Sequence, residues 1–190
     1  GFIKGLHDPS AALFYNGKLI AAVEEERCIR KKHAFDHIPH LAIDACLRKA
    51  KIHYQEIDAL AIGWDINHVV SYNSRSPILQ LADKDIANIF LPPNRYPDLQ
   101  KKDLTVSITP HHKAHATESF NNSGFGEAVI LVVDGSAEYD GTSIFVGSRN
   151  QEVKHFQCLP FSESLGIFYQ ALTSACGFNP FQEGKVMGLA

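Results

Sequence analysis

The chain has 190 residues, of which 45% are hydrophobic and 21% charged, and this is the composition of an ordinary globular protein long enough to bury a core. Its formal net charge of −3 argues against binding to nucleic acid or to a membrane surface. No apolar run approaches the roughly 20 residues of a membrane span. Four scattered cysteines without a CxxC pair fit a reducing, cytoplasmic location better than a zinc knuckle or a redox motif.

The first half of the chain predicts a strand meander followed by a helix. Strands are expected at residues 2–6, 11–15 and 18–23, and Asn16-Gly17 between the last two is a strong hairpin signal. An acidic-basic run at 24–27 leads into a predicted basic loop at 30–33, and Pro39 opens a predicted helix that ends near Ala50. A buried strand is expected at 57–64. Residues 65–103, apart from a helix near 78–90, are expected to be a surface excursion.

The second half begins with a predicted strand at 104–108. Pro110 then opens a helix that Asn122-Ser123-Gly124 ends. Three further strands are expected at 128–133, 142–146 and 153–158, and the turn Asp134-Gly135-Ser136 follows the first of them. Apolar residues at helical spacing predict a last helix at 162–176.

The order of strand, acidic turn, strand, hairpin, strand and helix thus occurs twice, once from Phe2 and once from Ala128. Two such α/β lobes are the plan of the actin/sugar-kinase/Hsp70 superfamily, in which acidic turns, here those of Asp8 and Asp134, hold nucleotide phosphates and a metal across a cleft. We therefore expect a first lobe at residues 1–126 and the beginning of a second, truncated lobe at 127–190. Two unrelated meanders are the alternative interpretation.

Three side chains of the second half form a candidate metal site. His111 and His115 are four residues apart, so a helix places both on one face. Asp134 ends an apolar strand, and open α/β sheets bind ligands at that edge. Two imidazoles and a carboxylate suit Fe, Mn or Zn. Zinc-protease chemistry is disfavoured because His112 stands where such an enzyme has its general base. An incidental histidine pair and a merely turn-forming Asp134 are the alternatives.

Four sequence blocks resemble the nodulation-type O-carbamoyltransferase family, which also makes carbamoylated antibiotics. The blocks are GLHDPSAALFYNGKLIAAVEEER (5–27), HHKAHA (111–116), VVDGSAE (132–138), and SLGIFYQALTSACGF (164–178) with EGKVMGLA (183–190). They occur in the family's order through nearly the whole chain, with residues 65–103 as the exception. The transferase domain of that family is similar to the Kae1 family, which modifies tRNA with threonylcarbamoyl groups, and it belongs to the superfamily named above.

The resemblance implies a carbamoyltransferase that works in two stages. Carbamoyl phosphate and ATP yield carbamoyl adenylate in a separate, YrdC-like C-terminal domain, and the Kae1-like domain then transfers the carbamoyl group to a hydroxyl of a small-molecule acceptor. By position, His111, His115 and Asp134 match the family's metal ligands, with iron as the expected ion and Mn or Zn as alternatives. A further Asp ligand would lie beyond Ala190, and the chain alone is expected to be inactive.

The remaining candidate residues lie in the same blocks. His7 and Asp8 are the candidate catalytic pair, although Asp8 could simply form an Asx-type turn before Pro9. The candidate residues for binding ATP or carbamoyl adenylate are Gly135, Ser136, Glu138 and Lys185.

Two other functions are compatible with the same fold. A Kae1-type tRNA threonylcarbamoyl transferase is disfavoured because the chain has no basic face, and tight, salt-sensitive tRNA binding would favour it. A non-catalytic nucleotide-binding module is the second alternative. Loss of bound metal and of activity on His115→Ala in the full-length protein would favour the enzyme, and unchanged activity would favour the module.

Overall fold

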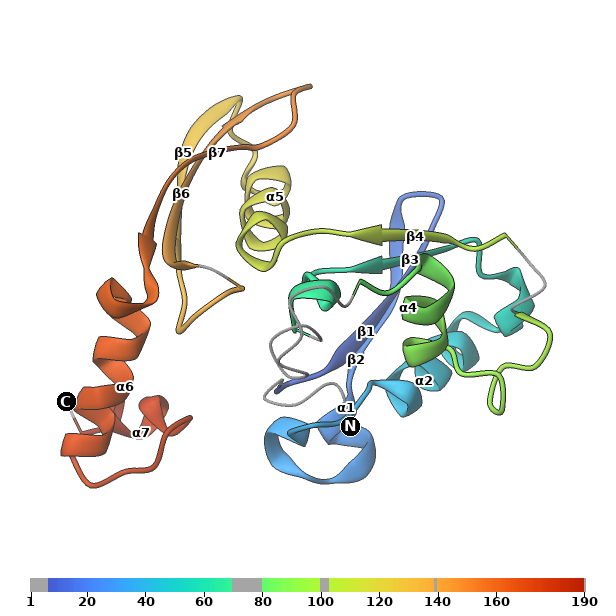
Figure 1. Ribbon diagram of the computed structural model, residues 1–190, viewed down its shortest axis with the longest axis horizontal. Coiled ribbons are helices and arrows are strands. Elements are labelled where there is room, and N and C mark those ends of the chain that lie inside the picture. The colour runs from blue at the N-terminus through green and yellow to red at the C-terminus, as the bar shows by residue number, and fades with distance from the viewer. Residues whose placement is uncertain (1–6, 70–79, 100–102, 139, 190) are drawn as a thin grey trace. The chain divides into compact units, whose positions relative to one another are not determined.

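The computed structural model describes residues 7–69, 80–99, 103–138 and 140–189, and it has a mixed α/β architecture (Figure 1). The chain divides into two compact units, one made of Gly1–Ile62 and Ile66–Ile108 and the other of Gly63–Asp65 and Thr109–Ala190. The predicted lobe boundary between residues 126 and 127 concerns a duplication of the fold, which this division does not test, so it stays a prediction. Among the described residues, no helix has the length and apolar character to cross a membrane.

The first unit begins with the hairpin that Asn16-Gly17 predicts. Strands β1 (Ser10–Tyr15) and β2 (Lys18–Glu24) pair antiparallel, with a bulge between Leu13 and Phe14. Asn16 and Gly17 have φ values of 48° and 74°, the left-handed pair that a tight two-residue hairpin turn requires. The predicted strand at 2–6 lies outside the described residues. Helix α2 (His40–Ala50), which starts after Pro39 as predicted, packs on both strands.

The segment after the hairpin differs from the prediction. Residues 25–29 form a short helix, α1 (Glu25–Ile29), and the predicted basic loop at 30–33 contains the 3-10 turn η1 (Lys32–Ala34). Glu25 is only 3% exposed, and its carboxylate accepts hydrogen bonds from the backbone N–H groups of Leu41 (3.2 Å) and Ala42 (2.7 Å). These amides lie in the first turn of α2, where no intrahelical partner exists. Glu25 therefore caps a helix that begins 15 residues later.

Removing this cap should loosen α2. For Glu25→Ala we expect a loss of about 1.5–3 kcal/mol of stability, because two N–H groups of the first turn, one of them buried, lose a charged acceptor. Hydrogen–deuterium exchange over the first turn of α2 should accelerate. Glu25→Gln keeps one acceptor oxygen and should show a smaller change. Equal exchange in Glu25→Ala and the unchanged protein would show that the contact does not stabilise the helix.

The rest of the first unit packs around an apolar cluster. The parallel strands β3 (Ala59–Ile62) and β4 (Thr105–Ile108) pair over four residues, and α4 (Asp83–Phe90) packs on β4. The 3-10 turn η2 (Tyr54–Glu56) precedes β3. Strand β3 is shorter than the predicted 57–64, and its residues alternate between exposed and half-buried rather than being buried. The cluster itself consists of Leu47, Leu91, Tyr96 and Leu99.

A polar contact borders this cluster and should make stability depend on pH. Burial opposes ionisation of Asp44, but hydrogen bonds from Arg95 and from the Tyr96 hydroxyl (2.8 Å) outweigh it and lower the pKa of Asp44 below its usual 3.8. A carboxyl group with a lowered folded-state pKa stabilises the fold above its unfolded-state pKa, and this contribution is lost as the pH falls through the folded-state value. Chemical unfolding at several pH values should therefore show a shallower acid loss in Asp44→Asn. Identical profiles would contradict this.

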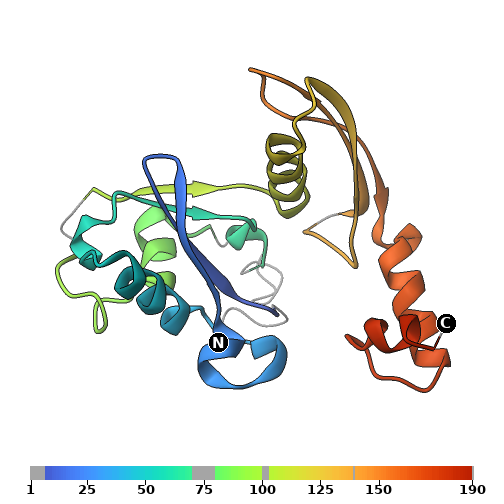
Figure 2. The ribbon, with the colours of Figure 1, turned by 180° about the vertical axis from the view of Figure 1, so that it is seen from behind.

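The second unit is built on the sheet β5 (Glu127–Val133), β6 (Asp140–Ser148) and β7 (Lys154–Pro160), in that order and antiparallel (Figure 2). Helix α5 (His111–Ser123) covers one face, and Gly124 ends it in the left-handed conformation, as predicted. The core between helix and sheet consists of Ala116, Phe120, Ile130, Val132, Phe145 and Val153.

The last part of the second unit carries its apolar residues on the outside. The turn η4 (Phe161–Glu163), α6 (Leu165–Ala175) and α7 (Glu183–Met187) follow β7. The helical spacing in α6 exists as predicted, yet Leu165 and Phe168 are 57% and 68% exposed. On β5, Val129 and Leu131 are likewise exposed on the face opposite α5. The apolar patterns of α6 and β5 predict that these elements form, but they do not predict what packs against their exposed apolar side chains.

Candidate metal centre

Helix α5 brings the two predicted histidine ligands together. Pro110 precedes the helix, so His111 lies in its first turn and His115 one turn later. Their Nε2 atoms are 3.1 Å apart. The spacing of four residues therefore does place both imidazoles on one face of the helix.

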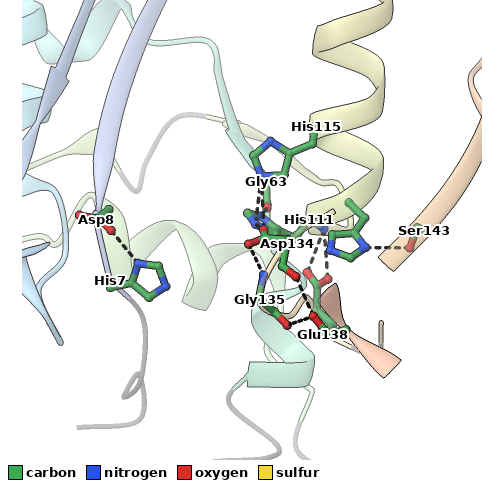
Figure 3. Close-up of polar contacts among 11 residues, drawn as sticks. His7, Asp8, Gly63, His111, His115, Asp134, Gly135, Glu138 and Ser143 are labelled. Atoms are coloured by element: carbon green, nitrogen blue, oxygen red, sulfur yellow. Dashed lines mark hydrogen bonds and ion pairs between the residues drawn. The ribbon is translucent and has the colours of Figure 1, made fainter. Parts of the chain in front are cut away.

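Asp134 joins this pair from the end of β5 (Figure 3). Its Oδ2 atom lies 3.0 Å from Nε2 of His111 and 3.8 Å from Nε2 of His115. The other oxygen, Oδ1, accepts a hydrogen bond of 2.6 Å from the backbone N–H of Gly135. That bond fixes the carboxylate with Oδ2 turned toward the histidines. The His111 hydrogen bond, assisted by Gly135 and opposed by burial, lowers the pKa of Asp134 to about 2.

The backbone carbonyl of Gly63 determines which ring nitrogen of His111 carries a proton. Nδ1 of His111 lies 3.2 Å from this oxygen, which can only accept a hydrogen bond, so Nδ1 carries a proton. With Nδ1–H directed at this carbonyl, Nε2 is the atom through which a neutral His111 would bind a metal, and such a carbonyl–histidine contact is the usual outer support of a metal ligand. The indole of Trp64 stacks on the same ring, with centroids 4.1 Å apart.

Glu138 supports the start of α5 rather than pointing a free carboxylate at the site. Both of its oxygens lie 3.1 Å from the backbone N of His111, and Oε1 also accepts a bond of 2.6 Å from the N–H of Asp65. A carboxylate at a helix N-terminus is favourable because the amides there have no intrahelical partner. Its predicted role in nucleotide binding stays a prediction.

His112 turns away from the other two histidines, as the helical spacing predicts. It is 3% exposed, and its Nδ1 lies 2.7 Å from the Ser143 hydroxyl on β6. Burial lowers the pKa of His112, so the imidazole is neutral at physiological pH.

The turn that carries Asp134 is fixed from α6. The Ser164 hydroxyl lies 2.8 Å from the backbone oxygens of both Asp134 and Gly135 and also caps α6 by accepting from the N–H of Ile167. Gly166 approaches the same turn so closely that a Cβ atom there would lie 2.3 Å from the Asp134 carbonyl oxygen. Ser164 and Gly166 belong to one of the four sequence blocks, but only the structure shows what they contact.

The donor set fits a divalent ion. Bonds of about 2.0–2.2 Å from nitrogen or oxygen to a metal place neighbouring ligand atoms of an octahedral ion about 3.0 Å apart. Two of the three observed separations are 3.0 and 3.1 Å, and the third is 3.8 Å. Two imidazoles and a carboxylate on one side of an ion leave further positions open, an arrangement suited to Fe(II) and also compatible with Mn or Zn.

The predicted catalytic pair lies in the first unit. Nδ1 of His7 is 2.7 Å from Oδ2 of Asp8. Asp8 is held by His33 in two ways: its backbone N–H donates to the His33 carbonyl at 2.8 Å, and its Oδ1 lies 3.0 Å from Nδ1 of His33. Burial opposes ionisation of Asp8, but the two histidines outweigh it and lower its pKa. Asp8 and His33 both have positive φ values, 51° and 60°, a left-handed conformation that Asp and His adopt more readily than most residues.

The other predicted residues are placed as follows. Gly135 and Ser136 lie in the turn after β5, and Lys185 lies in α7 with its ammonium 5.7 Å from the centre of the Phe178 ring. The roles of these three residues in nucleotide binding stay predictions.

Comparison with known proteins gives the family. The chain matches the family model described as carbamoyltransferase N-terminus over residues 1–190. This chain belongs to that family. The nodulation protein NolNO of Sinorhizobium fredii is 33% identical over an alignment of 191 residues that covers 97% of this chain and 28% of that protein. An uncharacterized protein of Synechocystis is 32% identical over 204 residues, covering 97% of this chain and 33% of that protein.

A shorter match points the same way. The nodulation protein NolO of Bradyrhizobium diazoefficiens is 35% identical over 80 residues, which are 42% of this chain and 14% of that protein. The chain spans about a third or less of the length of these curated relatives. The family predicted from the four sequence blocks is thus confirmed for this N-terminal region.

Sequence reasoning misses several residues that hold the family's blocks in place. Trp64 and the Gly63 carbonyl lie at the end of the predicted strand at 57–64, and no motif connects them to His111. The charged residues around His33 indicate a solvated loop, but His33 contacts Asp8 and is half-buried. Its position 25 residues after Asp8 gives no periodic signal, so only the folded chain reveals the contact.

Proposed function

We propose that this chain is the N-terminal part of an O-carbamoyltransferase, which transfers a carbamoyl group from carbamoyl adenylate to a hydroxyl of a small-molecule acceptor. The observation that carries the proposal is the convergence of His111, His115 and Asp134 in a chain of the carbamoyltransferase family. Carbamoyl adenylate would be formed from carbamoyl phosphate and ATP in a YrdC-like domain elsewhere in the whole protein.

The metal site has a defined part in this proposal. His111, His115 and Asp134 would hold a divalent ion, with iron as the first candidate. When bound, it would supply positive charge to phosphate oxygens and polarise the carbamoyl group. Gly63 would keep the Nε2 lone pair of His111 available, and Gly135 would keep Asp134 oriented. The nucleotide is proposed to lie against Gly135, Ser136, Glu138 and Lys185.

His7 would act as the general base. Its Nδ1 is 2.7 Å from the Asp8 carboxylate, which can only accept a hydrogen bond, so Nδ1 carries a proton and Nε2 is the ring atom that would take the proton of the acceptor hydroxyl. As the acceptor oxygen attacks the carbamoyl carbon, its proton would move to Nε2, the bond from that carbon to the phosphate oxygen would break, and AMP would leave. Asp8, held by His33, would stabilise the imidazolium that forms.

The duplicated actin-like plan is also part of the proposal. Asp8 precedes the antiparallel pair β1 and β2, and a helix follows. Asp134 precedes the antiparallel pair β6 and β7, and a turn and a helix follow. Two acidic turns in equivalent positions support two lobes of common plan, and a structure of the whole protein would test the match.

Substitution of His7 should separate the two stages of the reaction. In the whole protein, His7→Ala should lower carbamoyl transfer to the acceptor by about 10²–10⁴-fold, the usual contribution of a general base. Pyrophosphate release during formation of carbamoyl adenylate should continue. His53→Ala, at an exposed histidine of the same unit, is the control. An equal loss of both activities would contradict the assignment of His7 to the transfer stage.

The function itself is tested with the whole protein, carbamoyl phosphate, ATP and a panel of alcohols, with carbamoylated product measured by mass spectrometry. Product that depends on metal supports the proposal. Salt-sensitive tRNA binding together with tRNA modification would favour the Kae1-type alternative. Nucleotide binding without any product would favour the non-catalytic module.

A further inference from the structure

A second group of metal-ligand side chains lies on the three-stranded sheet of the second unit. Asp140, His155 and Cys158 each offer one ligand atom, and these atoms all lie within 4.8 Å of one another. None of the three belongs to the site around His111 or to the turn that carries His7 and Asp8. They come from β6 and β7, and His155 and Cys158 are exposed.

A β-bulge brings two of these side chains to the same face. In a regular strand, residues three apart point to opposite faces, so His155 and Cys158 would be separated. Here Ser143 pairs with Cys158 and Phe145 pairs with His155, with an irregularity between them that leaves Phe156 as the extra residue. Both side chains therefore lie on the face of Ser143 and Phe145. Bulges commonly re-aim a side chain in this way.

A second irregularity places Asp140. The pairing shifts between Asp140 and Thr142, so Gly141 is the extra residue there. A Cβ atom at Gly141 would lie 2.5 Å from Cβ of Ser164, which leaves room only for glycine. Two departures from regular pairing thus occur in one pair of strands, and each is next to a residue of the group.

Neighbouring residues hold the group in position. The His155 ring packs edge-on against Phe145, with centroids 5.1 Å apart. Oδ2 of Asp140 accepts a hydrogen bond of 3.2 Å from the fully buried Ser143 hydroxyl. Because that hydroxyl donates to Asp140, it accepts from Nδ1–H of the buried His112, 2.7 Å away. This chain of contacts orients the carboxylate from behind, as outer partners of metal ligands do.

We propose that Asp140, His155 and Cys158 form a zinc-class binding site, distinct from the His111 site, at the edge of the second unit's sheet. The donor set decides the class of ion, because a thiolate, an imidazole and a carboxylate together suit Zn²⁺. A Cys158 thiolate next to the Asp140 carboxylate would be two like charges, and a divalent cation compensates both. Tetrahedral zinc ligands lie about 3.5 Å apart, and the three ligand atoms lie within 4.8 Å of one another, so the exposed side chains would need to close by at most about 1.3 Å.

The site would join β6 to β7 and, through Ser143 and His112, to the helix that carries His111. Three protein ligands leave the fourth position to water. Because the ion would link two strands, its first effect would be to stabilise this unit. Zinc should therefore raise the melting temperature of the whole protein, and this increase should depend on Cys158.

Cobalt is the probe that separates the two sites. The His111 site contains no sulfur, so only a cysteine-containing site gives a thiolate-to-cobalt charge-transfer band in the near ultraviolet. Addition of Co²⁺ to the whole protein should produce this band, Zn²⁺ should bleach it, and Cys158→Ser should abolish it. The control is Cys176→Ser, an exposed cysteine at the end of α6. Ser143→Ala should weaken Co²⁺ binding about 10–100-fold.

A measurement on the unmodified protein makes the test independent of any variant. Zn²⁺ should slow the alkylation of Cys158 by iodoacetamide at least tenfold and leave Cys176 unaffected, as followed by peptide mass spectrometry. Absence of the band in the unmodified protein, its survival in Cys158→Ser, or alkylation of Cys158 at the same rate with and without zinc would each overturn the proposal.

Discussion

Replacement of His115 by alanine is expected to remove most of the bound metal from the whole protein. Loss of an outer partner of a metal ligand typically costs 10–100-fold in affinity, so loss of a ligand should cost at least about 100-fold. Elemental analysis of the purified protein and an equilibrium titration with Fe(II) or Mn(II) measure the change. Ser119→Ala, at an exposed position on the same helix, is the control and should bind metal normally.

The variant Asp134→Asn tests the third ligand of the same site. The amide oxygen can still accept the Gly135 N–H bond that holds the side chain, so the turn should persist while the negative charge is lost. Metal affinity should therefore fall as in His115→Ala, without a change in the folded structure. A full complement of metal in both variants would mean that these residues are not the ligands, and the proposed function would lose its main support.

Substitution of Gly166 by alanine is expected to disturb the same centre from outside it. An added Cβ atom would lie 2.3 Å from the carbonyl oxygen and 2.6 Å from the carbonyl carbon of Asp134. These are backbone atoms and cannot rotate away, so either the Asp134 turn or α6 must shift. We expect a loss of about 1–3 kcal/mol of stability, as for other overpacked sites, together with weaker metal binding.

The expected loss of stability in Gly166→Ala has the opposite sign to the usual effect of replacing a helical glycine by alanine. Alanine is a better helix former than glycine by about 1 kcal/mol, so a helical glycine with free space gains stability when replaced. Gly184 in α7 is the matched control, because a Cβ atom added there would have no neighbouring atom within 4 Å. Thermal unfolding should show a lower melting temperature for Gly166→Ala and an equal or higher one for Gly184→Ala. A stabilised Gly166→Ala variant would contradict the close approach.

Local patterns explain the parts of the fold that the sequence predicts correctly. Asn16-Gly17 specifies its hairpin, Pro39 and Pro110 begin their helices, and Gly124 ends α5, because each signal acts through the backbone of its own residues. Helix α1 escapes prediction for the opposite reason. Its Glu25 is buried because it caps a helix farther along the chain, and a charged run viewed alone gives no hint of such a partner.

The candidate metal site also combines local features, which the sequence predicts, with long-range contacts, which it does not. The spacing of His111 and His115 is a property of one helix and can be predicted, and the turn after an apolar strand indicates Asp134. The contacts that give these ligands their chemistry are long-range: Gly63 selects the tautomer of His111, and Ser164 fixes the Asp134 turn. Such contacts are set by packing between separate segments, and no periodicity in the sequence records them.

The second unit is discontinuous, since Gly63–Asp65 belongs to it together with Thr109–Ala190. This has a practical consequence for anyone who wishes to isolate the metal-binding part. A fragment that starts at Thr109 would retain His111, His115 and Asp134, yet it would lose the carbonyl that selects the His111 tautomer and the ring that stacks on it. A minimal metal-binding piece therefore needs both stretches, for example with Gly63–Asp65 grafted through a linker ahead of Thr109.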